Sequence, residues 1–116
     1  MALNKVQQVV LQELARSPLK NRFYWSGGTL LAEQYLQHRI SYDIDLFTND
    51  PFTYEEVMPL VRKIQHHIPN STIEEQKVFD RWEFFLHNHE EVRFEFVHYN
   101  FTPLKPHAAW EGVLID

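Results

Sequence analysis

The sequence predicts a single α+β domain in which helices pack on a mixed or antiparallel sheet. Apolar residues recur at helical spacing in the first half of the chain, and segments of strand-forming residues dominate the second half. At 116 residues the chain falls within the span of about 100 to 200 residues typical of one core. Its 44% hydrophobic and 15% aromatic content is enough to build that core.

Three segments have helical spacing. Residues 3–16 carry apolar residues at helical spacing and end before Pro18, and residues 29–38 repeat the pattern behind a pair of glycines. Residues 53–68 form the third, where Thr53 and Glu56 have the spacing of a capping box. Pro59 predicts either a kink in this helix or a helix that starts close to it.

The remaining segments favour strands, because they are rich in β-branched and aromatic residues and are bounded by turn formers. A short apolar run also lies near the C-terminus, at Val113 to Ile115. The expected strands cover residues 22–25, 43–47, 72–79, 81–86 and 92–99, with 87–91 as a hairpin turn.

Composition excludes several classes of protein. The absence of cysteine excludes a disulfide scaffold and thiolate metal sites. The sequence has neither a long apolar run nor a signal-peptide layout, so we expect a cytoplasmic protein without a membrane partner. A net charge of −5 argues against a general nucleic-acid coat.

Asp43 and Asp45 are the first candidates for chemistry. Residues two apart on a strand point to the same face, about 6 to 7 Å apart, so their carboxylates can converge on one point. Two adjacent like charges call for a counter-ion, and Mg²⁺ commonly takes one or two carboxylates together with substrate phosphates.

The glycine pair supplies a second candidate element. Gly27 and Gly28 precede the expected second helix, where backbone N–H groups and the helix dipole favour a phosphate. Ser26 and Thr29 add hydroxyl groups at the same place. Neither a Walker loop nor a dinucleotide fingerprint occurs in the sequence.

These residues together carry a family resemblance. A glycine pair, a short helix and then Asp-Ile-Asp resembles the polymerase-β-like nucleotidyltransferase superfamily. The fuller strings G-G-T-L-L-A and H-R-I-S-Y-D-I-D-L-F resemble most closely the AbiEii/AbiGii-type nucleotidyltransferase toxins. The resemblance implies the polymerase-β-like fold, with nucleotide contacts from Ser26, Gly27, Gly28, Thr29, Arg39 and Ser41.

The resemblance also implies the reaction. Two Mg²⁺ ions held by Asp43, Asp45 and a third carboxylate would promote transfer of a nucleotide from an NTP to an acceptor. Glu95, within the alternating V-R-F-E-F-V segment, is the best match to that third carboxylate, as ligand or base. Glu83 is the runner-up. A surface salt bridge between Arg93 and Glu95 is the alternative.

The resemblance leaves the biological role open. We expect a toxin of a toxin–antitoxin pair that acts on an RNA end such as tRNA, with a cognate antitoxin as partner. The alternatives are a small-molecule nucleotidyltransferase and a non-catalytic module that binds a nucleotide or a partner. We also expect residues 1–116 to form a minimal nucleotidyltransferase domain, in which the helical C-terminal region usual in the family is absent. The alternative is that the sequence is a fragment of a longer protein.

Overall fold

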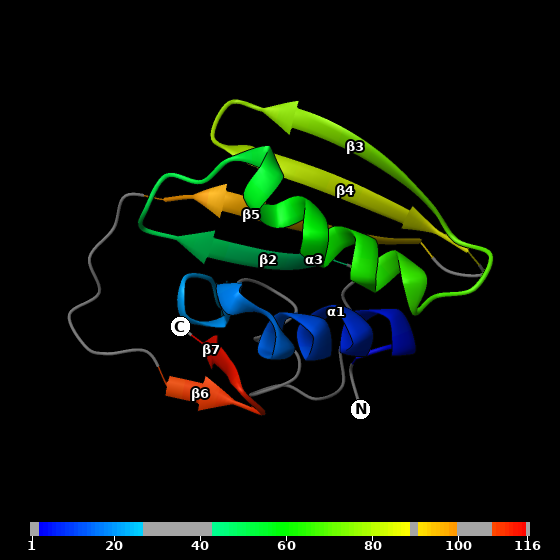
Figure 1. Cartoon of the computed structure of the whole chain (residues 1–116), viewed down its shortest axis with the longest axis horizontal. Helices are drawn as coiled ribbons and strands as arrows, with labels where there is room; N and C mark the ends of the chain where they lie inside the picture. The colour runs from blue at the N-terminus through cyan, green and yellow to red at the C-terminus, as the bar shows by residue number, and fades with distance from the viewer. Residues whose placement is uncertain (1–2, 27–42, 89–90, 100–107, 116) are drawn as a thin grey trace.

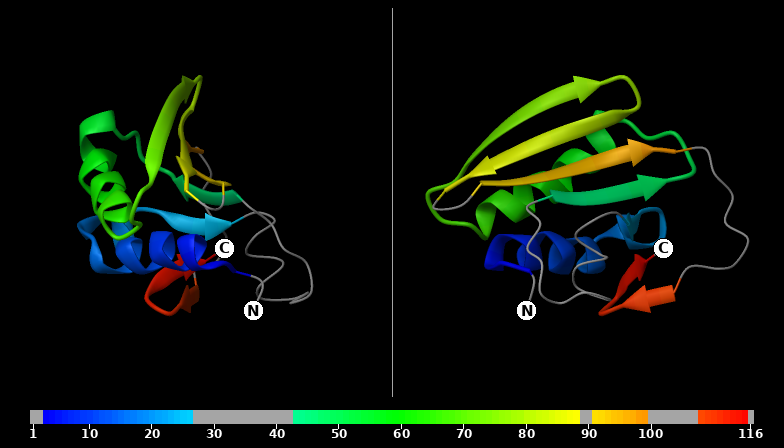
Figure 2. Two further views of the ribbon diagram at one scale, coloured as in Figure 1. Left: turned by 90° about the vertical axis from the view of Figure 1, so that its right-hand side faces the viewer. Right: turned by 180° about the vertical axis from the view of Figure 1, so that it is seen from behind.

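In the part of the chain that the structure describes, two α-helices pack on one face of a seven-stranded sheet (Figures 1 and 2). This arrangement comes from a computed structural model that describes residues 3–26, 43–88, 91–99 and 108–115. The side-on view in Figure 2 shows both helices on the same side of the sheet, which leaves the opposite face free of helices within the described ranges. An α+β chain with a mixed sheet is therefore confirmed.

The strand order is β3-β4-β5-β2-β1-β7-β6. Neighbouring strands are antiparallel except for the β2–β5 and β1–β7 pairs, which are parallel. The strands that carry most of the sheet match the predicted segments closely. Their bounds are β1 Tyr24–Ser26, β2 Asp43–Thr48, β3 Thr72–Val78, β4 Arg81–His87, β5 Glu91–His98, β6 Ala108–Trp110 and β7 Val113–Ile115.

The first helix, α1, spans Lys5–Arg16 and begins with a capping box. The Asn4 side chain accepts a hydrogen bond from the Gln7 amide, and the Gln7 side chain accepts one from the Asn4 amide. A short 3₁₀ helix, η1, follows at Pro18–Asn21. The predicted helix over residues 3–16 is confirmed.

Helix α3 spans Tyr54–His66 and begins with the predicted capping box between Thr53 and Glu56. Its start at Tyr54 shows that the alternative of a helix beginning close to Pro59 is wrong. Pro59 lies on the exposed side of the second turn. Pro59 has no backbone N–H to donate to the carbonyl of Glu55, and Glu55 is itself an exposed residue.

The core lies between the helices and the inner face of the sheet. Alternate residues of the central strands have no exposed surface, and they meet the apolar faces of α1 and α3. Aromatic rings interlock there: the Phe23 and Phe96 centroids lie 5.2 Å apart edge to face, and those of Phe84 and Phe94 lie 5.5 Å apart in a stack. The central strands are thereby fixed in register, which determines what their outer residues can meet.

Several predicted features lie outside the described residues, namely the helix over 29–38, the glycine pair, and Arg39 with Ser41. Two strands near the C-terminus add to the predicted set. The predicted apolar run forms β7, which pairs with β1, and β6 pairs with β7 in a hairpin. Within the described ranges, no helix is long and apolar enough to cross a membrane.

Candidate active site on the open face of the sheet

Strand β2 places the two aspartates on the face of the sheet opposite the helices. Ile44 and Leu46 point into the core with no exposed surface, so the alternating residues Asp43 and Asp45 point the other way. Strand β5 runs parallel beside β2, and its register places Arg93 opposite Asp43 and Glu95 opposite Asp45. The sequence candidates Asp43, Asp45 and Glu95 therefore share one surface.

Strand β4 extends this row of carboxylates by one position. Its antiparallel register with β5 places Glu83 directly opposite Glu95. Asp45, Glu95 and Glu83 thus occupy three adjacent strands at the same level. Glu95, the middle member, is only 4% exposed, so its charge is largely removed from water.

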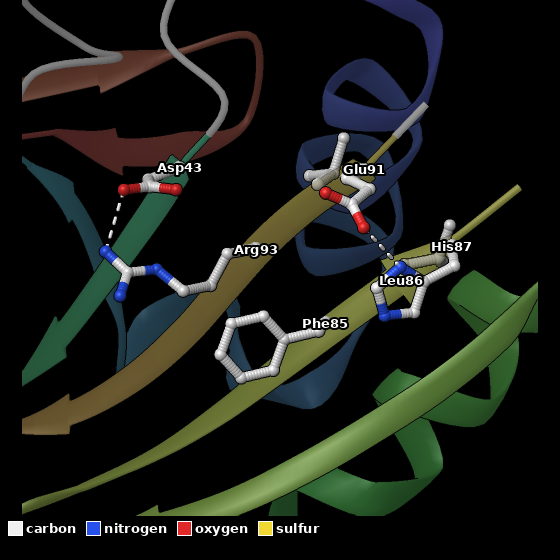
Figure 3. Close-up of a pocket in the computed structure, with 7 residues that line it drawn as sticks. Asp43, Phe85, Leu86, His87, Glu91 and Arg93 are labelled. Atoms are coloured by element: carbon white, nitrogen blue, oxygen red, sulfur yellow. Dashed lines mark hydrogen bonds and ion pairs between the residues drawn. The ribbon is translucent and has the colours of Figure 1, made fainter. Parts of the chain in front are cut away.

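Two arginines balance part of this negative charge. Arg93 donates from Nη2 to Oδ2 of Asp43 at 2.7 Å and from Nη1 to Oε2 of Glu83 at 3.3 Å (Figure 3 shows the Asp43 contact). Arg81 donates from Nη1 to Oε1 of Glu95 at 3.4 Å and from Nε to Oδ1 of Asp80 at 2.9 Å. Each planar guanidinium thus binds two carboxylates, Asp43 and Glu83 for Arg93 and Glu95 and Asp80 for Arg81.

The crowding of carboxylates changes their protonation. Burial, together with a hydrogen bond to Asp45 and repulsion from its charge, raises the pKa of Glu95 to about 7. Burial and the same kind of contact with Glu95 also raise the pKa of Glu83 above its ordinary value. The row is therefore a site where negative charge is held at a cost in free energy, which is common at functional sites.

Two buried oxygens in the row, Oδ1 of Asp45 and Oε2 of Glu95, receive no hydrogen bond from an N–H or hydroxyl group of the described residues, and the two carboxyl groups instead contact each other. Carboxylate oxygens of this kind suit a hard divalent cation, so these two residues fit the predicted magnesium ligands. In the arrangement observed, Asp43 is instead bound to Arg93. Among the residues that the structure describes, no three acidic or histidine side chains are gathered into a ready-made metal site.

Of the residues predicted to bind the nucleotide, the structure describes only Ser26. Ser26 ends β1 and lies opposite Asp45 in the antiparallel β1–β2 pair, so the start of the predicted phosphate turn borders the acidic row. Gly27, Gly28, Thr29, Arg39 and Ser41 lie outside the described residues. Trp25 has no exposed surface and belongs to the core, so it does not stack on a base.

Glu95 does not pair with Arg93, the partner expected in the alternative to a catalytic role. Within residues 43–88 and 91–99, Glu95 forms its ion pair with Arg81, and Arg93 forms its pairs with Asp43 and Glu83. The alternative of a surface salt bridge between Arg93 and Glu95 is therefore wrong. The sequence predicted neither the contact of Arg81 with Glu95 nor the bridge that Arg93 forms between Asp43 and Glu83. The alternation of residues in R-W-E-F-F and in V-R-F-E-F predicts that the charged side chains of each strand lie on one face. Which of them meet across the strands depends on the β4–β5 register, which tertiary structure determines.

Comparisons with known proteins agree with this arrangement. Two crystal structures from Helicobacter pylori share the fold: a candidate nucleotidyltransferase, at 18% sequence identity and a TM-score of 0.67, and the protein JHP933, at 20% identity and a TM-score of 0.66. Each alignment covers 96% of this chain but only 50% and 49% of the respective crystallised chain, so this chain spans about half their length. No curated protein sequence gives a significant match.

A family model gives the most direct assignment. The model of the AbiEii nucleotidyl transferase toxins of type IV toxin–antitoxin systems matches residues 9–105, which include both aspartates of β2 and Glu95 of β5. The match covers most of the chain, and the resemblance that the sequence motifs indicated is thereby confirmed. This chain belongs to the AbiEii nucleotidyl transferase toxin family.

Proposed function

We propose that this protein is a metal-dependent nucleotidyltransferase with the polymerase-β-like fold, which transfers a nucleotide from an NTP to an RNA end such as that of tRNA. The observation that carries the proposal is the contact between the carboxyl groups of Asp45 and Glu95, whose buried Oδ1 and Oε2 receive no hydrogen bond from an N–H or hydroxyl group of the described residues. This contact lies beside the strand end that leads into the glycine pair. The family membership supports the reaction class.

Asp43, Asp45 and Glu95 are the residues that would hold two Mg²⁺ ions. Bound there, the ions would activate the attacking hydroxyl and neutralise the charge of the triphosphate and of the leaving pyrophosphate. The acceptor oxygen forms its bond to the α-phosphorus of the NTP while the bond to pyrophosphate breaks. The proton of the attacking hydroxyl passes to Glu95 or to solvent.

The arginines have positioning roles in this proposal. Arg81 donates to Oε1 of Glu95, whereas the buried Oε2 receives no hydrogen bond from an N–H or hydroxyl group of the described residues. Arg93 holds Asp43 by Oδ2 and so fixes the rotamer of a carboxylate that is 42% exposed. Ser26 and the residues after it would contact the phosphates of the NTP.

The family also guides the choice of partners. Its description names type IV toxin–antitoxin systems, and we therefore include a cognate antitoxin among the partners of this protein. RNA is the proposed acceptor because an RNA 3′ end offers a free hydroxyl, the nucleophile that nucleotidyl transfer requires.

The test is an incubation of the protein with Mg²⁺, each labelled NTP and total tRNA, followed by separation of RNA from small molecules. We expect label on RNA with the wild type and none with Asp45→Asn, whose far-ultraviolet circular dichroism should match the wild type. Asp50→Asn is the matched control, because Asp50 is an exposed aspartate just beyond β2.

Each other outcome has a definite meaning. Full activity of Asp45→Asn would disprove the assigned site. Label on small molecules alone would replace RNA by a small-molecule acceptor. No transfer from any NTP would reject the proposed activity and favour a module that only binds.

A further inference from the structure

A cavity of about 530 Å³ opens on the same face of the sheet, beside Asp43 (Figure 3). Its volume lies within the range of about 300 to 1,000 Å³ that is usual for small-molecule sites. Its lining comes from the start of β2, the end of β4 and the start of β5. The lining residues are Asp43, Phe85, Leu86, His87, Glu91, Val92 and Arg93.

The cavity lies on one side of β2, the strand that carries Asp43 and Asp45. Strand β2 has β1 as one neighbour and β5 as the other, and β4 follows β5. Ser26, where the predicted phosphate turn begins, is on the β1 side. The cavity extends from Asp43 across β5 to β4, which is the opposite side.

The lining combines one aromatic ring with charged groups of both signs. Phe85 is partly exposed and lies opposite Arg93 in the β4–β5 pair. Glu91, with a side chain that is 83% exposed, lies 3.0 Å from Nδ1 of His87. Arg93 offers hydrogen-bond donors, whereas Asp43 and Glu91 offer acceptors.

These groups discriminate between possible occupants. A phosphate would be repelled by the exposed carboxylate of Glu91, and Arg93 already pairs with Asp43 and Glu83. A nucleobase is planar and uncharged, can stack on Phe85, and carries both amino donors and ring acceptors for the surrounding charges. The lining therefore suits a base better than a phosphate.

We propose that this cavity binds the terminal base of the RNA acceptor. The inference rests on the proposed nucleotidyl transfer. In an in-line displacement the attacking and leaving oxygens lie on opposite sides of the phosphorus. If the triphosphate lies toward Ser26, the acceptor approaches from the side of β5 and β4, where the cavity is.

The test measures RNA binding rather than transfer. A 5′-fluorescein-labelled single-stranded RNA with a free 3′-hydroxyl is titrated with the wild type, Phe85→Leu and Phe85→Tyr, and fluorescence anisotropy is recorded. Leucine keeps an apolar side chain on the strand but removes the stacking ring, whereas tyrosine keeps the ring. ATP binding to each protein is measured in parallel by calorimetry with Mg²⁺.

We expect Phe85→Leu to weaken RNA binding at least about five-fold, the lower end of what stacking of one base contributes. Phe85→Tyr should bind RNA as the wild type does, and ATP binding should be unchanged in all variants. Phe47→Leu is the matched control, because Phe47 is a partly exposed phenylalanine on the same face of β2 but outside the cavity.

Three results would overturn the inference. The first is unchanged RNA binding by Phe85→Leu, and the second is no RNA binding by the wild type. The third is a Phe85→Leu variant that loses ATP binding but keeps RNA binding, which would assign the cavity to the base of the NTP. The proposed function can fail separately. Absence of transfer with intact, Phe85-dependent RNA binding would reject the reaction and keep the cavity as a base-binding site.

Discussion

Replacement of Glu95 by glutamine should stabilise the metal-free protein at alkaline pH. Glu95 is 4% exposed, and burial and contact with Asp45 raise its pKa to about 7, against 4.5 for an ordinary glutamate. The folded protein therefore binds this proton more tightly than the unfolded chain does. The stabilisation that Glu95 contributes is therefore greatest below pH 4.5, falls as the pH rises and is lost above pH 7.

The size of the effect follows from the two pKa values. Their difference corresponds to a loss of about 3 kcal/mol in the free energy of unfolding between pH 4.5 and pH 8. Glutamine has nearly the same shape as the protonated carboxyl and carries no charge. The Glu95→Gln variant should therefore lack this loss and exceed the wild type in stability by up to about 3 kcal/mol at pH 8.

The assay is urea unfolding in EDTA at several pH values, followed by the fluorescence of Trp25 and Trp82, which belong to the packed interior. Glu74→Gln is the matched control, since Glu74 lies on β3 with a side chain that is 78% exposed, and its pH profile should parallel that of the wild type. A Glu95→Gln variant that is less stable than the wild type at pH 8 would refute the reasoning. So would equal stability of the two proteins at pH 8.

Two further predictions concern stability. Arg93→Lys should lower the free energy of unfolding by about 1 kcal/mol, because one ammonium cannot bind Asp43 and Glu83 in the fork geometry of a guanidinium. Arg62→Lys, at an exposed position, is the control. Equal urea midpoints for Arg93→Lys and the wild type would contradict this prediction. Phe79 is 97% exposed and has a φ of 27° between β3 and β4, so Phe79→Asn should raise stability by about 1 kcal/mol. Phe79→Ala should give no such gain in a thermal melt, and an equal gain would show that backbone strain is not the cause.

Local signals made the helices and strands predictable from sequence. The apolar faces of α1 and α3 and the capping box of α3 involve residues a few positions apart, so one stretch of sequence contains the whole signal. The same is true of the alternation that marks β2 and β5. Helix α3 starts before Pro59 because the capping box at Thr53 and the buried face outweigh one missing hydrogen bond near the exposed N-terminus.

The partners of the site residues were not predictable, because they depend on register between distant strands. Glu95 was identified from its flanking apolar residues, but its burial and its pairing with Arg81 follow from the β4–β5 register. The cavity beside Asp43 likewise depends on which strands become neighbours. The catalytic, metal and nucleotide roles assigned to these residues stay predictions.

The parallel pairing of β2 with β5 also has a consequence for how the protein is made. Asp45 and Glu95 are neighbours in space but fifty residues apart in sequence, so their meeting requires closure of a long loop. During synthesis, β2 is made before β5. A nascent or partly degraded chain that lacks β5 therefore contains the aspartates without Glu95. Under the proposed mechanism, nucleotidyl transfer would thereby depend on completion of the sheet.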